Sequence, residues 1–170
     1  NTRVEEANFP EGLEYIKGFA FEGSDLKKAI LPSTLKELSE YTFSLCLKLQ
    51  EIKIPESVTT IPNAFAYDCP LLEKVNIPRG VTVIEAYAFG SNVMLKPIDL
   101  PEGLKRIEND AFYYCAVDSI IFPASLEYLG GGSCACWKYV KKIYSLSPNP
   151  PYCSEDIPNP GEGPFYGYTP

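Results

Sequence analysis

A dipeptide of one apolar residue followed by proline recurs six times in this chain of 170 residues. Successive copies are 22, 23, 23, 23 and 22 residues apart. The six copies are Phe9-Pro10, Leu31-Pro32, Ile54-Pro55, Ile77-Pro78, Leu100-Pro101 and Phe122-Pro123. A fixed period in the twenties is typical of a solenoid, a coil in which each turn buries its apolar face against its neighbours. The period therefore constrains the fold more than any other feature of the chain.

Each dipeptide closes the pattern apolar-x-x-apolar-x-apolar-Pro, as in residues 49–55, LQEIKIP. The last two apolar positions alternate as one face of a short strand, and proline ends the strand because it has no N–H for the ladder. The first such strand is expected at Val4 to Phe9. A second apolar pair follows each proline, and an aromatic residue recurs four or five residues later. This column, which we expect to form the core, reads Phe21, Phe43, Phe65, Phe89 and Phe112, with Cys134 in the last turn.

The repeated unit resembles the BspA-like class of leucine-rich repeats, whose pattern is L-x-x-I-x-I-P-x-x-V-x-x-I-x-x-x-A-F-x-x-C. Residues 4–145 carry the resemblance, and residues 54–69, IPESVTTIPNAFAYDC, match almost word for word. It implies a strand-rich, right-handed leucine-rich-repeat solenoid of about six turns, with short helical or irregular convex turns. We expect the solenoid at residues 1–145, beginning within a repeat and ending in a degenerate turn. Residues 146–170 are expected to form an irregular, Pro/Gly-rich capping segment, and the chain is interpreted as a piece of a longer protein.

The composition excludes several functions. Lys and Arg number 15 against 22 Asp and Glu, a net charge of −7, which disfavours nucleic acid or an anionic membrane as a partner. No apolar run approaches the roughly 18 residues of a membrane-spanning helix. The chain has no histidine, which removes Ser-His-Asp and Cys-His catalysis and histidine metal sites. The acid pairs Glu108/Asp110 and Glu155/Asp156 are interpreted as solvated surface, so we predict no enzyme activity, cofactor or metal.

The cysteines fall into two groups. Cys46, Cys69 and Cys115 share a column with Ser24, Asn92 and Trp137, which predicts buried free thiols at a tight inward turn. Cys134, Cys136 and Cys153 lie at the irregular end of the chain. A disulfide from Cys153 to either Cys134 or Cys136 is one possibility, and free thiols are the other.

The outward positions of the repeated strand form two charge columns. One reads Glu5, Lys27, Gln50, Glu73, Lys96, Asp118 and Lys141. The other begins Glu6, Lys28, Glu51 and Lys74, then breaks at Pro97 and Ser119 before Lys142. Most signs alternate from turn to turn, which predicts pairing between neighbouring turns rather than a binding stripe of one sign.

Apolar residues interrupt the outward columns near the C-terminal end, at Ile121, Tyr139 and Tyr144. Either the C-terminal segment covers them or they contact a protein partner, so they are the candidate binding residues. The resemblance implies a non-enzymatic binding or adhesion module of an exported bacterial surface protein, located outside the cell, although no signal is present in this chain. Its ligand would be a protein, such as a host or neighbouring-cell surface protein, with no nucleic acid and no membrane insertion. The alternatives are a structural spacer and an accessory region of a larger extracellular protein.

Overall fold

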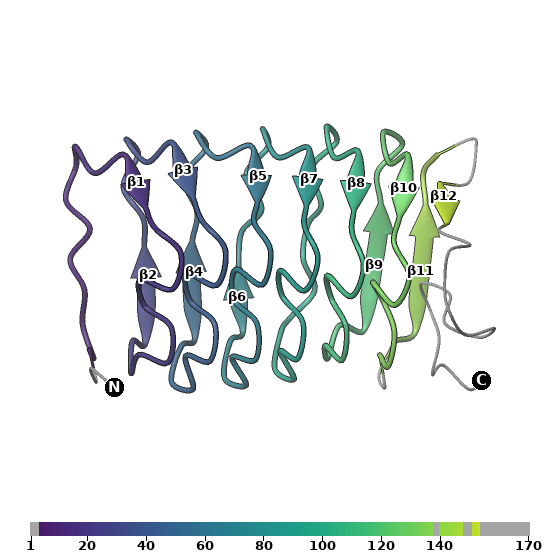
Figure 1. The fold of residues 1–170 in the computed structure, drawn as a ribbon. Coiled ribbons are helices and arrows are strands. Elements are labelled where there is room, and N and C mark those ends of the chain that lie inside the picture. The colour runs from purple at the N-terminus through teal and green to yellow at the C-terminus, as the bar shows by residue number, and fades with distance from the viewer. Residues whose placement is uncertain (1–3, 138–139, 148–150, 154–170) are drawn as a thin grey trace.

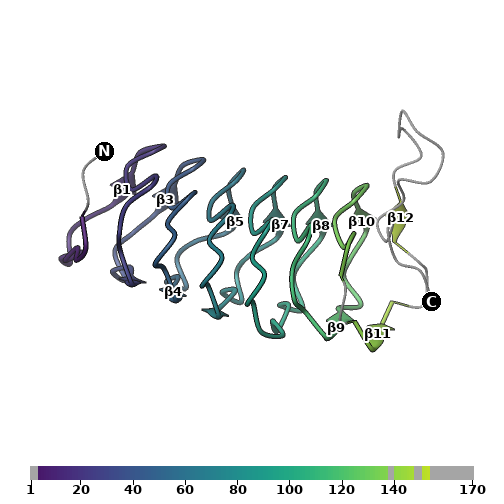
Figure 2. The ribbon, with the colours of Figure 1, turned by 90° about the horizontal axis from the view of Figure 1, so that it is seen from below.

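The computed structural model describes residues 4–137, 140–147 and 151–153, and these form one row of stacked turns (Figures 1 and 2). Every strand pair is parallel, and each pair joins neighbouring positions of successive turns. The strands form two rows along the coil, and the strands of one row point in the opposite direction to those of the other, across the coil, as the arrows in Figure 1 show. The predicted leucine-rich-repeat solenoid is confirmed.

The first row contains the strands predicted from the apolar-Pro pattern. They are β2 (Lys28–Ile30), β4 (Glu51–Lys53), β6 (Lys74–Val75), β9 (Ser119–Phe122) and β11 (Lys142–Ser145). In register, Ile52 pairs with Ala29 and Val75, and the charged neighbours of Ile52 face outward. Two repeats lack the strand. Residues 4–9, where the first strand was expected, form none, and neither do residues 95–100.

The second row of strands was not expected from the sequence. It comprises β1 (Tyr15–Ile16), β3 (Glu37–Leu38), β5 (Thr60–Ile61), β7 (Val83–Ile84), β8 (Arg106–Ile107), β10 (Tyr128–Leu129) and β12 (Tyr152–Cys153). Except for β12, these strands are formed by the second apolar pair of each repeat, and the last member of that pair, such as Ile61 or Ile84, points into the core. Strand β12 pairs with β10 inside the segment predicted to be irregular. The capping role of residues 146–170 stays a prediction, since 148–150 and 154–170 lie outside the described residues.

Of the two alternatives predicted for the convex turns, helical or irregular, the helical one is wrong, because the described residues contain no helix. We call residues 39–46, 62–69, 85–92 and 108–115 the corner strip. In its first turn the N–H groups of Tyr41, Phe43 and Leu45 donate to carbonyls of residues 63, 65 and 67 in the next turn, at 3.0, 2.8 and 2.8 Å. A helix would need these N–H groups for carbonyls four residues earlier. The corner strip is therefore a third ladder between turns.

The phenylalanine column is the centre of the core, as predicted. Phe43, Phe65, Phe89 and Phe112 are fully buried, and neighbouring ring centroids lie 5.5, 6.1 and 5.6 Å apart. The planes of Phe89 and Phe112 differ by 14°, whereas Phe65 stands at 85° to Phe43 and 89° to Phe89. Ala66, which donates to Ala88 O, takes the backbone position that Phe43 and Phe89 hold in their turns. The ring of Phe65 therefore enters the stack from one residue earlier and stands perpendicular.

The column behind the phenylalanines, which contains three cysteines, Asn92 and Trp137, makes the same hydrogen bond in each turn. Each member donates a hydrogen bond to the carbonyl of the phenylalanine position one turn earlier. The donors and acceptors are Cys46 to Phe21 (3.0 Å), Cys69 to Phe43 (3.1 Å), Asn92 to Ala66 (2.9 Å), Cys115 to Phe89 (3.1 Å) and Trp137 to Phe112 (2.7 Å). A buried carbonyl without a partner is destabilising, so this position requires a donor but tolerates a thiol, an amide or an indole. The prediction of buried free thiols in this column is confirmed.

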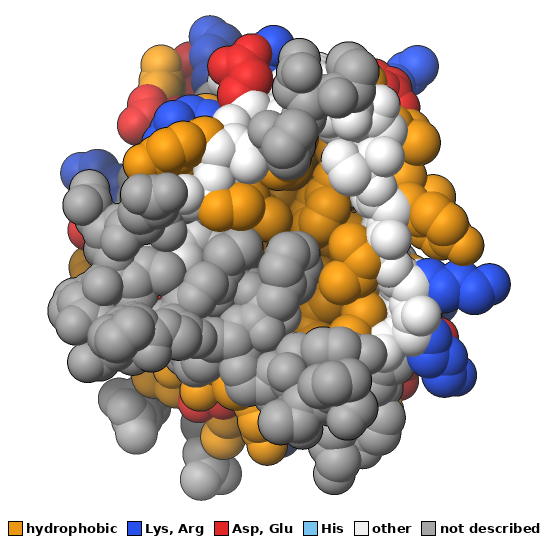
Figure 3. All heavy atoms as spheres, turned by 90° about the vertical axis from the view of Figure 1, so that its right-hand side faces the viewer, with side chains coloured by type: hydrophobic (Ala, Val, Ile, Leu, Met, Phe, Trp, Pro, Cys, Tyr) orange, Lys and Arg blue, Asp and Glu red, His pale blue; other side chains and the backbone are white. Residues whose placement is uncertain are grey.

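Hydrophobic side chains fill the middle of the coil when it is viewed from its C-terminal end, and charged side chains lie at the rim (Figure 3). All six cysteines are free, so the structure has no disulfide at Cys134, Cys136 or Cys153.

Replacing Phe65 with alanine is expected to lower the free energy of unfolding by about 3–5 kcal/mol, because a fully buried ring is removed. Urea unfolding measures the loss. The double variant Phe65→Ala/Ala66→Phe has the Ala-Phe order of residues 88–89 and should recover most of the stability. An unfolding midpoint for Phe65→Ala equal to that of the parent would contradict the packing described.

Substitutions at Asn92 test whether the column behind the phenylalanines requires a hydrogen-bond donor. The Asn92 amide donates to Ala66 O and Phe89 O and accepts from Cys69 N, all buried. Asn92→Leu is expected to cost about 3 kcal/mol in urea unfolding, because it leaves these groups unpaired. Asn92→Cys, which places the usual residue of the column there, should cost less. Equal losses for both variants would show that the donor is not what the position requires.

Candidate functional site

A groove of about 430 Å³ lies beside β9 and β11, on the outer side of the first row of strands. One wall comes from residues 95–100, which lack a strand of the first row, and includes Pro97, Ile98 and Leu100. The other comes from β9 and β11 and includes Ile121 and Tyr144. The groove is thus mainly apolar and aromatic, with Asp99, Glu102 and Lys142 at its edges.

Pro97 explains why the groove exists. The first row runs from β2 through β4 to β6, stops, and resumes at β9 and β11. Lys96 N still donates to Glu73 O at 3.1 Å. Pro97 stands where β2, β4 and β6 have Lys28, Glu51 and Lys74, and it has no N–H to continue the ladder. Residues 97–100 consequently pair with neither β6 nor β9, and the surface is hollow there.

Two of the three candidate residues are brought together by strand register. Tyr144 of β11 pairs directly with Ile121 of β9, and their exposed fractions are 50% and 53%. Adjacent apolar side chains at this exposure are unusual on a strand that elsewhere carries charge. Tyr139 lies outside the described residues. Whether the C-terminal segment covers Ile121 and Tyr144 stays a prediction, because residues 154–170 also lie outside them.

The central turns of this face carry paired charges, as predicted. Lys28 Nζ lies 3.0 Å from Glu51 Oε2, and Lys96 Nζ lies 2.6 Å from Glu73 Oε2. The hydrogen bond from Lys28 is the main reason that the pKa of Glu51 is lowered, and Lys96 has the same effect on the pKa of Glu73. These two ion pairs join neighbouring turns, whereas Lys27, Lys53 and Lys74 form no ion pair within the described residues.

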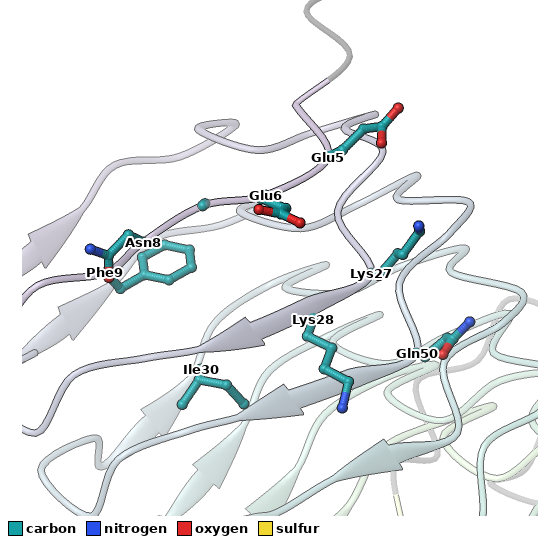
Figure 4. Close-up of a pocket in the computed structure, with 9 residues that line it drawn as sticks. Glu5, Glu6, Asn8, Phe9, Lys27, Lys28, Ile30 and Gln50 are labelled. Carbon is teal, nitrogen blue, oxygen red and sulfur yellow. The ribbon is translucent and has the colours of Figure 1, made fainter.

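The predicted pairs at the N-terminal end are not seen: Glu5 and Glu6 make no ion pair within the described residues. Residues 5–9 lie away from β2, and a cavity of about 640 Å³ separates them (Figure 4). Lys27 and Lys28 line it from the side of the coil, and Lys28 is already paired with Glu51. This cavity is charged on both sides, in contrast to the apolar groove.

The buried thiols are poor nucleophiles. Burial raises the pKa of Cys115 to about 12 and also raises the pKa of Cys134. A hydrogen bond to Cys46 and then burial raise the pKa of Cys69. The same bond lowers the pKa of Cys46, but this residue is fully buried. Within the part of the chain that the structure describes, no group of three Cys, Asp or Glu residues could hold a metal ion.

Sequence reasoning identified Ile121 and Tyr144 but missed the opposite wall of the groove. Ile98 and Leu100 were assigned to a strand like those of the other repeats. The available signal was Pro97, which appeared in the sequence only as a break in one charge column. A proline inside a strand pattern indicates a missing ladder bond, and therefore a gap beside it.

Stacked turns, parallel ladders and a phenylalanine core define a leucine-rich-repeat solenoid. Residues 1–115 and 62–149 match the model of the BspA type leucine rich repeat region, with six copies. The chain therefore belongs to the BspA-type leucine-rich repeat family. In the described residues no helix is long and apolar enough to cross a membrane.

Solved structures with the same fold are bacterial leucine-rich repeat proteins. The T. pallidum Leucine Rich Repeat protein (TpLRR) is 25% identical, with a TM-score of 0.74 over 82% of this chain and 67% of its own. A leucine-rich repeat protein from Bacteroides ovatus is 19% identical (TM-score 0.69, 84% and 49%). A leucine rich cell surface protein from Faecalibacterium prausnitzii is 18% identical (TM-score 0.62, 81% and 52%). This chain spans about half to two thirds of their lengths, and no curated protein matches it.

The paired charges give a prediction for acid titration. Lys28→Met should raise the pKa of Glu51 towards its ordinary value of 4.5, because Lys28 supplies the first two causes of the lowering. NMR titration of the Glu51 carboxyl measures it. Lys53→Met is the control and should have a smaller effect, because Lys53 is the weakest contributor. No change in the Glu51 pKa with Lys28→Met would contradict the pairing.

The sign of the linkage follows from the lowered pKa. Glu51 is charged in the folded state to lower pH than in the unfolded state, so the stabilisation is complete above pH 4.5 and is lost as pH falls through the folded pKa. Since the side chains of Lys28 and Glu51 are 62% and 33% exposed, solvent screens the pair and the effect on stability is small.

Proposed function

We propose that this chain is a non-enzymatic protein-binding module of an exported bacterial surface protein, and that its ligand contacts the groove beside β9 and β11. The observation that carries the proposal is the exposed pair Ile121 and Tyr144, which lie side by side in β9 and β11, next to the groove at residues 97–100. Aromatic anchors set beside a hollow dominate the energy of protein interfaces.

The groove favours binding over a purely structural role. In a spacer, uniform charge pairing along the whole strand face would be sufficient. The pairs Lys28–Glu51 and Glu73–Lys96 fit that description on the central turns. From residue 97 onwards the face carries apolar groups in a hollow instead, which supports a contact surface at this end.

The place on the cell surface rests on relatives. The similar F. prausnitzii protein is described as a leucine rich cell surface protein, and its likeness to this chain is one of fold. A stack of turns that each present the same face suits a ligand that touches several turns together. A host or neighbouring-cell surface protein is accordingly the ligand class proposed, and adhesion is the role.

The test uses the whole 170-residue chain. The chain is applied to an array of purified cell-surface ectodomains, and it is also immobilised and used to select binders from a display library of random 12-residue peptides. For each binder, Tyr144→Ala is expected to weaken binding by about 2 kcal/mol, roughly 30-fold. Glu51→Ala and Lys74→Ala are matched controls from the central turns and should be nearly silent. The placement is wrong if the control variants abolish binding while Tyr144→Ala leaves the Kd unchanged.

A further inference from the structure

Exposed aromatic rings follow the corner strip, away from the groove just described. Phe19 and Tyr41 stack in parallel, with centroids 4.9 Å apart and planes 6° apart. Further along, Tyr67 and Tyr87 meet edge to face at 6.0 Å. Phe19 and Tyr87 are 52% and 42% exposed, whereas Tyr41 and Tyr67 are partly buried. The rings therefore pack against one another and also form part of the surface.

The rings occupy backbone positions that do not favour them. Phe19, Tyr41 and Tyr87 have φ values of 62°, 54° and 56°, the left-handed region that glycine or asparagine adopts more readily. The third ladder imposes this conformation, because it turns the N–H of each of these residues towards the next turn. Phe19 and Tyr87 each pack against one ring of a neighbouring turn, and packing within the chain leaves about half of each of these two rings exposed. This points to a contact outside it.

The corner strip also has one sign of charge. Residues 39–46, 62–69, 85–92 and 108–115 contain five carboxylates and no Lys or Arg, whereas the equivalent residues 17–24 of the preceding turn, which include Phe19, contain Lys17 and Glu22. The five are Glu40, Asp68, Glu85, Glu108 and Asp110. Both rows of strands, by contrast, mix the two signs. A surface with a single sign of charge attracts the opposite charge and gains nothing from a neutral ligand.

The chain itself shows how this combination holds a cation. The guanidinium carbon of Arg106 lies 4.1 Å from the centroid of the Tyr128 ring. Its Nε donates to Glu108 Oε1 at 2.7 Å. One arginine thus lies on a tyrosine face and pairs with a carboxylate, a favourable arrangement for a planar, weakly hydrated cation.

We propose that the corner strip binds an arginine-rich segment of another polypeptide. Its guanidinium groups lie on the faces of Tyr41, Tyr67 and Tyr87 and pair with Glu40 and Asp68. Tyr41, Tyr67 and Tyr87 come from three successive turns, so an extended segment contacts several turns together. Arginine is favoured over lysine because its planar group both stacks and donates two hydrogen bonds. The inference stands on the corner strip alone and does not depend on a ligand in the groove.

The experiment measures binding of a fluorescent ten-residue peptide, (Arg-Gly)5, to the full chain as a function of NaCl concentration. We expect (Arg-Gly)5 to bind more tightly than (Lys-Gly)5, and (Glu-Gly)5 not to bind. The variant Glu40→Gln/Asp68→Asn should weaken (Arg-Gly)5 about fivefold. Asparagine tolerates the left-handed conformation of residue 68, so folding is preserved. Tyr87→Leu should weaken binding about threefold.

The matched control is Glu37→Gln/Glu51→Gln, which removes the same two charges from the rows of strands and should change the affinity less than twofold. Tyr144→Ala should have no effect, which separates this surface from the groove. Equal weakening by the two double variants would overturn the proposal, because it would indicate attraction to net charge alone. Failure of (Arg-Gly)5 to bind more tightly than (Glu-Gly)5 would also overturn it. So would salt-independent binding of neutral cellohexaose that Tyr87→Leu abolishes, since the rings would then serve a glycan.

Discussion

The backbone hydrogen bond from one turn to the next is the interaction on which this structure depends. Three ladders carry it: the two rows of parallel strands and the corner strip, where Tyr41, Phe43 and Leu45 donate to the following turn. Every turn supplies the hydrogen-bond partners of its neighbour, and equivalent residues of successive turns therefore form columns. All residues of one column must meet the same chemical requirement. The phenylalanine column requires a buried ring, and the column behind it requires a hydrogen-bond donor. Side chains that look unrelated in sequence, such as Cys69, Asn92 and Trp137, are equivalent in this sense.

Both proposed contact surfaces lie where the pattern of a column changes. Along the first row, Lys28 pairs with Glu51 and Glu73 pairs with Lys96, so ion pairs join neighbouring turns. Pro97 removes one N–H, the strand is lost, and a groove opens between residues 97–100 and the exposed pair Ile121 and Tyr144. The corner strip differs from the two rows of strands in its charge, because it contains carboxylates and no Lys or Arg. The same regular frame thus carries two surfaces of different chemistry.

The sequence predicted what depends on period and missed what depends on one residue. The spacing of Ile54-Pro55 and Ile77-Pro78 is sufficient for the solenoid, the first row of strands and the buried phenylalanines, since each turn repeats the evidence. The convex turns were predicted as helical or irregular, and the helical alternative was wrong, because an apolar pattern does not reveal that N–H groups such as that of Phe43 donate to the next turn rather than to their own. Ile121 and Tyr144 were found as exceptions in a column. Their opposite wall, with Ile98 and Leu100, was missed because it depends on Pro97 alone.

Amide hydrogen exchange measured residue by residue tests the central claim, which is that ladders between turns hold the fold and that the first ladder is interrupted at Pro97. The account predicts slow exchange for Phe43, Ala66 and Phe89 in the corner strip, whose N–H groups donate to the next turn. It predicts slow exchange in β4 and much faster exchange at residues 98–100, which pair with no strand. Protection of residues 98–100 equal to that of β4, or fast exchange along the corner strip, would contradict it.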